Sequence, residues 1–114
     1  MAKYERRLTG DFDALVRWLH SDITTGSISV SYEDGSDVQM GEVRTAVRVY
    51  ERYSALGGNR VSMNVTIVGN GENLFVSAIT SGGSQAVFFK INTFGENSFL
   101  GICEGSVERF ISSQ

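Results

Sequence analysis

Hydrophobic residues recur at helical spacing in residues 11–26, which predicts an amphipathic helix. The apolar positions of its buried face are Phe12, Leu15, Val16, Leu19 and Ile23. Asp11 and Asp13 suit the positive N-terminal end of the helix dipole, and Gly26 suits a left-handed residue that ends the helix. The preceding residues 3–8 alternate weakly and predict a short edge strand.

A second amphipathic helix is predicted near the C-terminus. The sequence Thr-Phe-Gly-Glu, with Thr93 and Glu96 three residues apart, is typical of a capping box at a helix start. The apolar face that follows consists of Phe99, Ile102, Cys103, Val107 and Phe110. Gly101 and Gly105 each cost about 1 kcal/mol relative to alanine in a helix. We therefore expect them to permit close approach to the sheet or to the first helix.

Between the helices, apolar and polar residues alternate with the period of two that is typical of strands. Glycine-bearing turns are predicted at residues 33–35, 41–42, 56–58, 70–71 and 82–83. They define six antiparallel strands and pair each inward residue with another inward residue. The inward set is Ile28, Val30, Tyr32, Val38, Met40, Val43, Thr45, Val47, Val49, Tyr53, Val61, Met63, Val65, Ile67, Leu74, Val76, Ala78, Val87, Phe89 and Ile91.

Residues 43–53 fit both a helix and a strand. We favour a strand, because β-branched Val43, Thr45, Val47 and Val49 alternate along it. The predicted fold is therefore α+β, with an antiparallel six- to seven-stranded meander sheet and two helices packed on one face. The order is strand, helix, six strands, helix, in a single domain over residues 1–114.

Composition and charge narrow the class of protein. The 114 residues include 13 glycines and no proline, and the formal net charge is −3, which disfavours nucleic acid and acidic membranes as partners. No apolar run approaches the roughly 18 residues needed to span a bilayer, and the N-terminus lacks a secretory signal. A single cysteine excludes an internal disulfide. We expect a cytoplasmic protein.

Residues capable of catalysis or metal binding are sparse. His20 is the only histidine and is expected on the helix surface, whereas Cys103 falls on an apolar helix face. A Cys-His pair, a metal site and a catalytic triad all lack supporting spacing, so we expect no cofactor and place an enzyme third among the possible functions. The sequence Ser-Gly-Gly-Ser at 81–84 is interpreted as a turn, with an anion-binding nest as the alternative.

Two segments, YERYSALGGNRVSMNVTIVG at residues 50–69 and AITSGGSQAVFFKINTFGE at residues 78–96, carry a family resemblance. They resemble segments of a small bacterial domain family of unknown function, and the resemblance covers most of the chain. It implies no activity and no functional residue. The order of elements also resembles helix-grip and TATA-binding-protein-like folds, although a fold does not fix a function.

The outward face of the predicted sheet is the strongest functional signal. It has a basic strand with Arg44, Arg48, Tyr50 and Arg52, and an apolar cluster formed by Val68, Phe75, Ile79, Ala86 and Phe88. Back-to-back packing in a homodimer is the favoured explanation of the cluster. The alternatives are single-stranded nucleic acid on the arginines and aromatics, or a cover provided by the N-terminal segment or a loop.

The second candidate function is binding of a small apolar or anionic ligand between helices and sheet. Arg44, Arg48 and Arg52 are the best anion contacts in the sequence. An apolar pocket could instead be lined by Met40, Met63, Phe89, Phe99 and Phe110, unless these residues simply fill the core.

Overall fold

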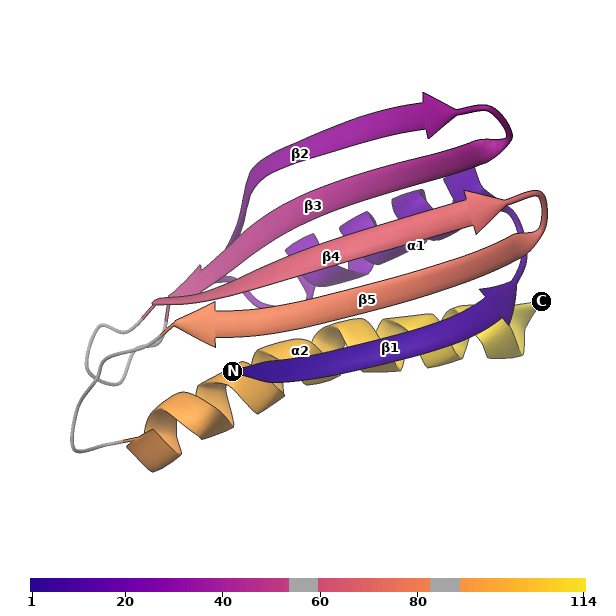
Figure 1. Cartoon of the computed structure of the whole chain (residues 1–114). Coiled ribbons are helices and arrows are strands. Elements are labelled where there is room, and N and C mark those ends of the chain that lie inside the picture. Colours follow the sequence, from indigo (N-terminus) through magenta and orange to yellow (C-terminus); the bar gives the residue numbers. More distant parts are fainter. Residues whose placement is uncertain (54–59, 83–88) are drawn as a thin grey trace.

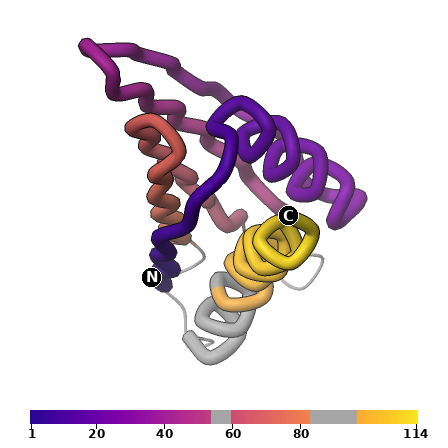
Figure 2. The backbone as a smooth tube through the Cα atoms, turned by 90° about the vertical axis from the view of Figure 1, so that its right-hand side faces the viewer, coloured from indigo at the N-terminus to yellow at the C-terminus, as the bar shows by residue number. Residues whose placement is uncertain are grey.

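The computed structural model describes residues 1–53, 60–82 and 89–114. Its elements are β1 (Ala2–Thr9), α1 (Phe12–Thr25), β2 (Val30–Met40), β3 (Val43–Tyr53), β4 (Arg60–Asn70), β5 (Asn73–Gly82) and α2 (Phe89–Ser113). The strands form an antiparallel sheet of five strands in the order β1-β5-β4-β3-β2 (Figure 1). Figure 2 shows both helices against the same face of this sheet. The predicted α+β architecture is confirmed, but the prediction of six to seven strands is wrong.

One predicted strand is lost because residues 30–40 form a single bulged strand instead of a hairpin. The predicted turn at residues 33–35 lies inside β2, which pairs with β3 along its whole length. A β-bulge between Tyr32 and Asp34 absorbs the extra residue. Ile28, predicted to face inward, precedes β2 and is fully exposed.

The other predicted strand, residues 84–92, is contradicted by the start of α2 at Phe89. Phe89, Ile91 and Thr93 belong to helical backbone, so the predicted capping box at Thr93 is also wrong. The predicted turn at 56–58, the turn residue Gly83 and Val87 lie outside the described residues. The nest predicted at 81–84 lies partly outside them. Apolar residues in a short run do not distinguish a strand from a buried helix.

The hairpin turns are built from glycine followed by glutamate. Gly41 and Gly71 have φ of 61° and 62°, the left-handed backbone that glycine adopts without steric cost. The first turn pairs Met40 with Val43, as predicted. The second turn is Gly71-Glu72 rather than Asn70-Gly71, so Ile67 pairs with Val76 and not with Leu74. This shift of two residues leaves every side chain on its predicted face.

The register between β3 and β4 differs from the prediction by one residue. Arg52 pairs with Val61 and Ala46 with Ile67, whereas Tyr53 and Val47 were predicted there. A one-residue shift moves each side chain of a strand to the opposite face. Ala46 and Tyr50 are therefore buried, and the valines of β3 face away from the helices.

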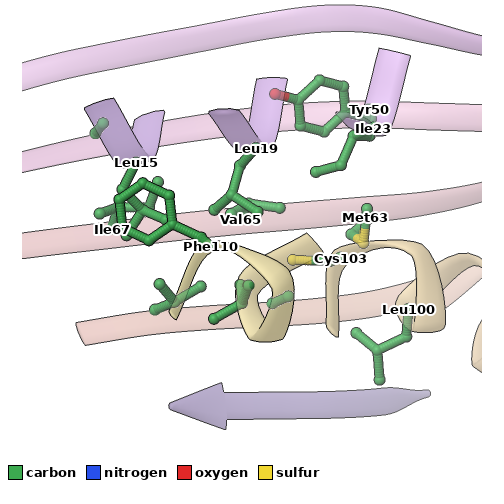
Figure 3. Close-up of a cluster of buried hydrophobic side chains, with 14 of the residues drawn as sticks. Leu15, Leu19, Ile23, Tyr50, Met63, Val65, Ile67, Leu100, Cys103 and Phe110 are labelled. Atoms are coloured by element: carbon green, nitrogen blue, oxygen red, sulfur yellow. The ribbon is translucent and has the colours of Figure 1, made fainter. Parts of the chain in front are cut away.

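The core lies between the helices and the sheet (Figure 3). Leu15, Leu19 and Ile23 enter it from α1, as the helical spacing predicted. From α2, the predicted residues Phe99, Cys103, Val107 and Phe110 are buried. Met63 is buried as well, but Met40 lies on the other face with 75% of its surface exposed. Burial of these apolar side chains makes the largest favourable contribution to the free energy of packing the helices on the sheet.

The helix ends follow the sequence only in part. The carboxylate of Asp11 caps α1 by accepting a hydrogen bond of 2.8 Å from the amide of Ala14. Gly26 ends the helix with right-handed backbone at φ −72°, so the left-handed stop predicted there is wrong. Gly101 is exposed with open space beside it, and Gly105 lies near the guanidinium of Arg109. Neither glycine provides the predicted close approach.

Candidate functional site

The arginines of β3 lie on the helix side of the sheet, which corrects the prediction that they face outward. Arg44 forms two hydrogen bonds of 2.8 Å with the carboxylate of Asp13 on α1, and its guanidinium lies 4.5 Å from the ring centre of Phe12. Arg52 lies 5.1 Å from the ring centre of Phe99 on α2. Arginine stems cover apolar surface while their charged groups reach water, so these two arginines bind the helices to the sheet.

Arg48 and Tyr50 occupy the middle of the same face. Arg48 donates to Asp37 on β2 at 2.9 Å, and 17% of its side chain is exposed. Tyr50 is buried, and its hydroxyl lies 2.9 Å from Nδ1 of His20 on α1. Burial raises the pKa of Tyr50 above its ordinary value, so this residue remains a neutral hydroxyl.

His20, Tyr32 and Tyr50 form a three-ring cluster beside Arg48. The ring centres are 5.0 Å apart for His20 and Tyr32, and 5.7 Å apart for each of the other two pairs. His20 and Tyr32 meet edge to face, a favourable arrangement for aromatic rings. The sequence placed His20 on the helix surface and Tyr32 in the core, and gave no sign that the two meet.

A cleft of about 390 Å³ opens at this cluster, between α1 and the strands β2 and β3. Its lining residues are Val16, Arg17, His20, Ser21, Tyr32 and Arg48. This α1–β2 cleft has two arginines and no carboxylate among its lining residues. It can therefore accept a negatively charged group beside aromatic rings.

A larger recess, of about 470 Å³, lies at the hairpin end of the sheet. Three carboxylates line it, from Asp11, Glu42 and Glu72, together with Arg44. The carboxylate of Asp11 caps α1, and the guanidinium of Arg44 donates hydrogen bonds to Asp13. The hydrogen bonds from Arg44 lower the pKa of Asp13 below its ordinary value, so the pair stays charged at neutral pH.

The opposite face of the sheet is uncovered by either helix (Figure 2). Val68, Phe75 and Ile79 lie on it, as predicted from the alternation, and Val68 pairs directly with Phe75. Ala86 and Phe88 lie outside the described residues. The register also brings apolar residues here that were predicted to face inward, namely Val38, Met40, Val43, Val47 and Val49. We call the apolar set on β2–β5, without Ala86 and Phe88, the outer apolar face.

Exposure of the outer apolar face is greatest toward the β2–β3 hairpin. Met40 is 75% exposed, Val38 52% and Val43 37%. Toward β1, Ile79 on β5 is 38% exposed. The guanidinium carbon of Arg7 on β1 lies 5.4 Å from the ring centre of Phe75. Apolar side chains that a protein's own elements leave exposed on one face are typical of an interaction site.

Nucleophilic and metal-binding groups do not converge in the described structure. Cys103 is fully buried, and burial raises the pKa of its thiol to about 12, which leaves it unreactive at neutral pH. Among the described residues, no three His, Cys, Asp or Glu side chains are placed to bind a metal ion together. Within the same ranges, neither helix has the length and apolar character needed to cross a bilayer.

The comparisons with known proteins give one match. Residues 1–111 match the model of a family described as a family of unknown function, DUF6054. The chain belongs to this family. The match covers nearly the whole of this DUF6054 chain, and it confirms the resemblance to a family of unknown function. Neither the curated proteins nor the solved structures include a match to this DUF6054 chain.

Proposed function

We propose that this DUF6054 domain acts by self-association, with the outer apolar faces of two copies packed back to back. The observation that supports it is an apolar sheet face that neither helix covers. Two sheets that pack face to face bury such surfaces at a separation of about 10 Å. A second copy fits this face because both partners present the same residues, which is the condition for a symmetric dimer.

The area available is that of a stable interface. Five strands with about ten residues each project roughly 800 Å² per face, from the spacing and rise of β-strands. A standard protein interface buries roughly 800 Å² on each partner. The exposed set includes Val38, Met40 and Val43, which a dimer would remove from water.

The distribution of charge on this face also favours a dimer. The outward residues of β3 from Val43 to Val49, and of β4 from Ser62 to Val68, carry no charge. Charged residues lie at the rim instead, with Lys3, Glu5 and Arg7 on β1 and with Glu33 and Asp34 on β2. An uncharged centre with a charged rim is the usual anatomy of an interface.

The rim charges select one orientation. If β1 of one copy lay across β1 of its partner in reversed direction, Lys3 would approach Arg7 and Glu5 would approach Glu5. With the two-fold axis along the strands, β1 lies across the acidic β2 of the partner, so opposite charges meet. We therefore expect a dimer whose two-fold axis runs parallel to the strands.

The sheet edge is less suitable for association than the face. β2 is an edge strand with a bulge and the acidic residues Glu33, Asp34 and Asp37. Bulges and charges on an edge strand oppose pairing with another strand. We place the domain in the cytoplasm, where a buried unpaired thiol such as Cys103 is the ordinary state of cysteine.

The proposal is tested with neighbouring residues of β2 that point to opposite faces. Val38→Lys places a charge on the outer apolar face, whereas Gln39→Lys places the same charge on the other face. We expect Val38→Lys, and Val47→Lys at the centre, to raise the dimer dissociation constant about tenfold or more. Sedimentation equilibrium at micromolar concentrations measures this constant, and Gln39→Lys should leave it unchanged.

Two results would contradict self-association through this face. One is a wild-type protein that sediments as a monomer throughout the micromolar range. The other is a dimer that Val38→Lys and Gln39→Lys weaken equally, since that would place the contact elsewhere. Far-ultraviolet circular dichroism of each variant confirms that the sheet remains folded.

A further inference from the structure

We propose that the α1–β2 cleft binds a small organic anion that carries an aromatic ring, the class of an aromatic carboxylate. The cleft lies on the helix side of the sheet, away from the outer apolar face. This inference is therefore independent of self-association, and each can fail without the other. It rests on the shape of the cleft, the aromatic rings at its wall and the charge of its lining.

The size of the cleft suits a small molecule. Its volume of about 390 Å³ falls in the range of roughly 300–1,000 Å³ that is usual for ligand sites. Apolar surface comes from Val16 and the ring of Tyr32, and polar groups come from both α1 and β3. A few polar groups placed around an apolar surface are the usual composition of such sites.

The bulge in β2 is what brings Tyr32 to the cleft. Gly35 and Asp37 face inward opposite Arg48 and Ala46, so regular alternation would turn Tyr32 outward. The bulge leaves Glu33 without a partner on β3, so Tyr32 lies opposite Tyr50 on the inner face. Bulges often re-aim a side chain beside a functional site.

Gly35 provides the space that the Tyr32 side chain occupies. A Cβ atom at residue 35 would lie 2.4 Å from the Tyr32 hydroxyl oxygen and 2.8 Å from the Val47 carbonyl oxygen. It would also lie 3.0 Å from Cδ of Arg48. Only glycine lets the tyrosine ring lie along the strand next to Arg48, so the wall of the cleft depends on this residue.

A contact with Tyr50 on the sheet fixes the orientation of the His20 ring. The buried hydroxyl of Tyr50 engages Nδ1 of His20 at 2.9 Å. If Tyr50 donates this hydrogen bond, the tautomer that results carries its proton on Nε2, which is then a donor. In the described part of the chain, the imidazole ring of His20 has no other hydrogen-bond partner. Nε2 is therefore the ring nitrogen available to a ligand.

The charge of the cleft favours an anion. The side chain of Arg17 is exposed, and its guanidinium makes no hydrogen bond to any described residue. Arg48, on β3, lines the same cleft. Asp37, whose side chain is 67% exposed and does not line the cleft, accepts hydrogen bonds from Nη1 and Nη2 of Arg48 at 2.9 and 3.3 Å. The Nε–H of Arg48 has no acceptor among the described residues, so it is the group that Arg48 can offer to a ligand. A ligand carboxylate can accept hydrogen bonds from both guanidinium groups while its ring contacts Tyr32.

The test is a titration with sodium benzoate at constant ionic strength, followed by amide resonances in nitrogen-15 NMR spectra. We expect saturable shifts at residues 16–21, at Tyr32 and at Arg48. Residues 43–47, which precede Arg48 on the same strand, should not shift more than Arg48 does. Arg48→Gln should raise the dissociation constant about tenfold, the value of a charge-assisted hydrogen bond. Arg17→Gln and Tyr32→Ala, at exposed positions, should each raise it about threefold or more.

The control variant is Arg7→Gln, which removes the same charge from the other face of the sheet and should leave the benzoate constant unchanged. Benzyl alcohol tests the need for charge, and inorganic phosphate tests the need for the ring. The proposal is overturned if benzyl alcohol or phosphate binds as tightly as benzoate. It is equally overturned if shifts fall outside the cleft, if none saturate, or if Arg17→Gln and Arg7→Gln behave alike.

Discussion

At the scale of single residues, Asp22 of α1 connects the two helices through hydrogen bonds from Ser106 and Arg109 of α2. Ser106 is fully buried on α2, and its hydroxyl donates to the carboxylate of Asp22 on α1 at 2.5 Å. Trp18 adds a second link through its indole N–H, which donates to the Ser106 carbonyl at 2.9 Å. A buried polar group without a partner costs more than its hydrogen bond contributes, so the helix pair depends on Asp22.

Replacing Asp22 should therefore destabilise the fold. We expect Asp22→Ala to lower the free energy of unfolding by about 1–3 kcal/mol, because it leaves the Ser106 hydroxyl buried without an acceptor. Urea denaturation measures this loss. The control Asp13→Ala breaks an exposed ion pair and should cost about 1 kcal/mol or less. Equal losses in the two variants, or no loss in Asp22→Ala, would show that this contact does not hold the helices together.

The sequence identified most buried residues of the helices but not the buried polar contacts. Leu15, Leu19, Cys103 and Val107 follow from helical spacing, because a helix can bury only one face against the sheet. The partnership of Tyr50 with His20 joins residues 30 positions apart. No local pattern encodes it, and the same holds for the α1–β2 cleft.

At the scale of elements, the bulge at Glu33 sets the phase of β2. Tyr32 and Asp34 pair with the adjacent residues Tyr50 and Val49, so Glu33 has no partner of its own on β3. Removing an unpaired residue leaves the remaining pairs in their present register. Removing a paired residue such as Ser36 moves the side chains on one side of the gap to the opposite face of the sheet.

Deletion of Glu33 should thus be tolerated far better than deletion of Ser36. We expect loss of Glu33 to change the free energy of unfolding by about 1 kcal/mol, since the buried faces are conserved. Loss of Ser36 should cost about 3 kcal/mol or more, because inward residues on one side of the gap turn outward. Both residues are exposed in the same strand, which makes them a matched pair for urea denaturation. A similar cost for both deletions would refute this role of the bulge.

Of the predicted two-residue turns, the one at residues 41–42 gave the observed pairing, whereas the one at residues 70–71 was displaced by one residue. Gly41-Glu42 set the β2–β3 pairing correctly, because a left-handed glycine in a short loop permits few registers. The link between β3 and β4 is longer, and there the register was wrong by one residue. Valines at 43, 47 and 49 have high strand propensity on either face, so the alternation did not reveal which face is buried.

At the scale of the whole molecule, carboxylate contacts connect the helix layer to the sheet. Glu108 on α2 accepts hydrogen bonds from the Tyr4 hydroxyl at 2.7 Å and from Arg6 at 3.0 Å, both on β1. These hydrogen bonds, that of Arg6 first, lower the pKa of Glu108 below its ordinary value. Asp13 on α1 is affected in the same direction by Arg44 on β3.

The two lowered carboxylate pKa values predict a loss of stability in acid. A group whose pKa is lower in the folded state stabilises that state above its unfolded pKa, and the contribution disappears as the pH falls through the folded pKa. We therefore expect the unfolding midpoint to fall between about pH 5 and pH 3, in thermal melts at constant ionic strength.

The variant Glu108→Gln should reduce this dependence on pH. Glu104→Gln is its control, because it removes the same charge from an exposed position one turn away on α2. An acid profile that Glu108→Gln leaves unaltered, or that Glu104→Gln reduces equally, would contradict the role assigned to the Glu108 contacts.

The sequence alone was sufficient to predict the α+β class, the two amphipathic helices, the edge strand at the N-terminus and the turn at Gly41-Glu42. Periodicity and glycine backbone preferences are local properties, so neighbouring residues suffice to specify them. The face of the β3 arginines, the single bulged β2 and the contact of His20 with Tyr32 and Tyr50 depend on packing between distant segments. The physical reason is competition for burial: the sheet registers that bury Tyr50 and Ala46 under the helices leave the valines on the outer apolar face.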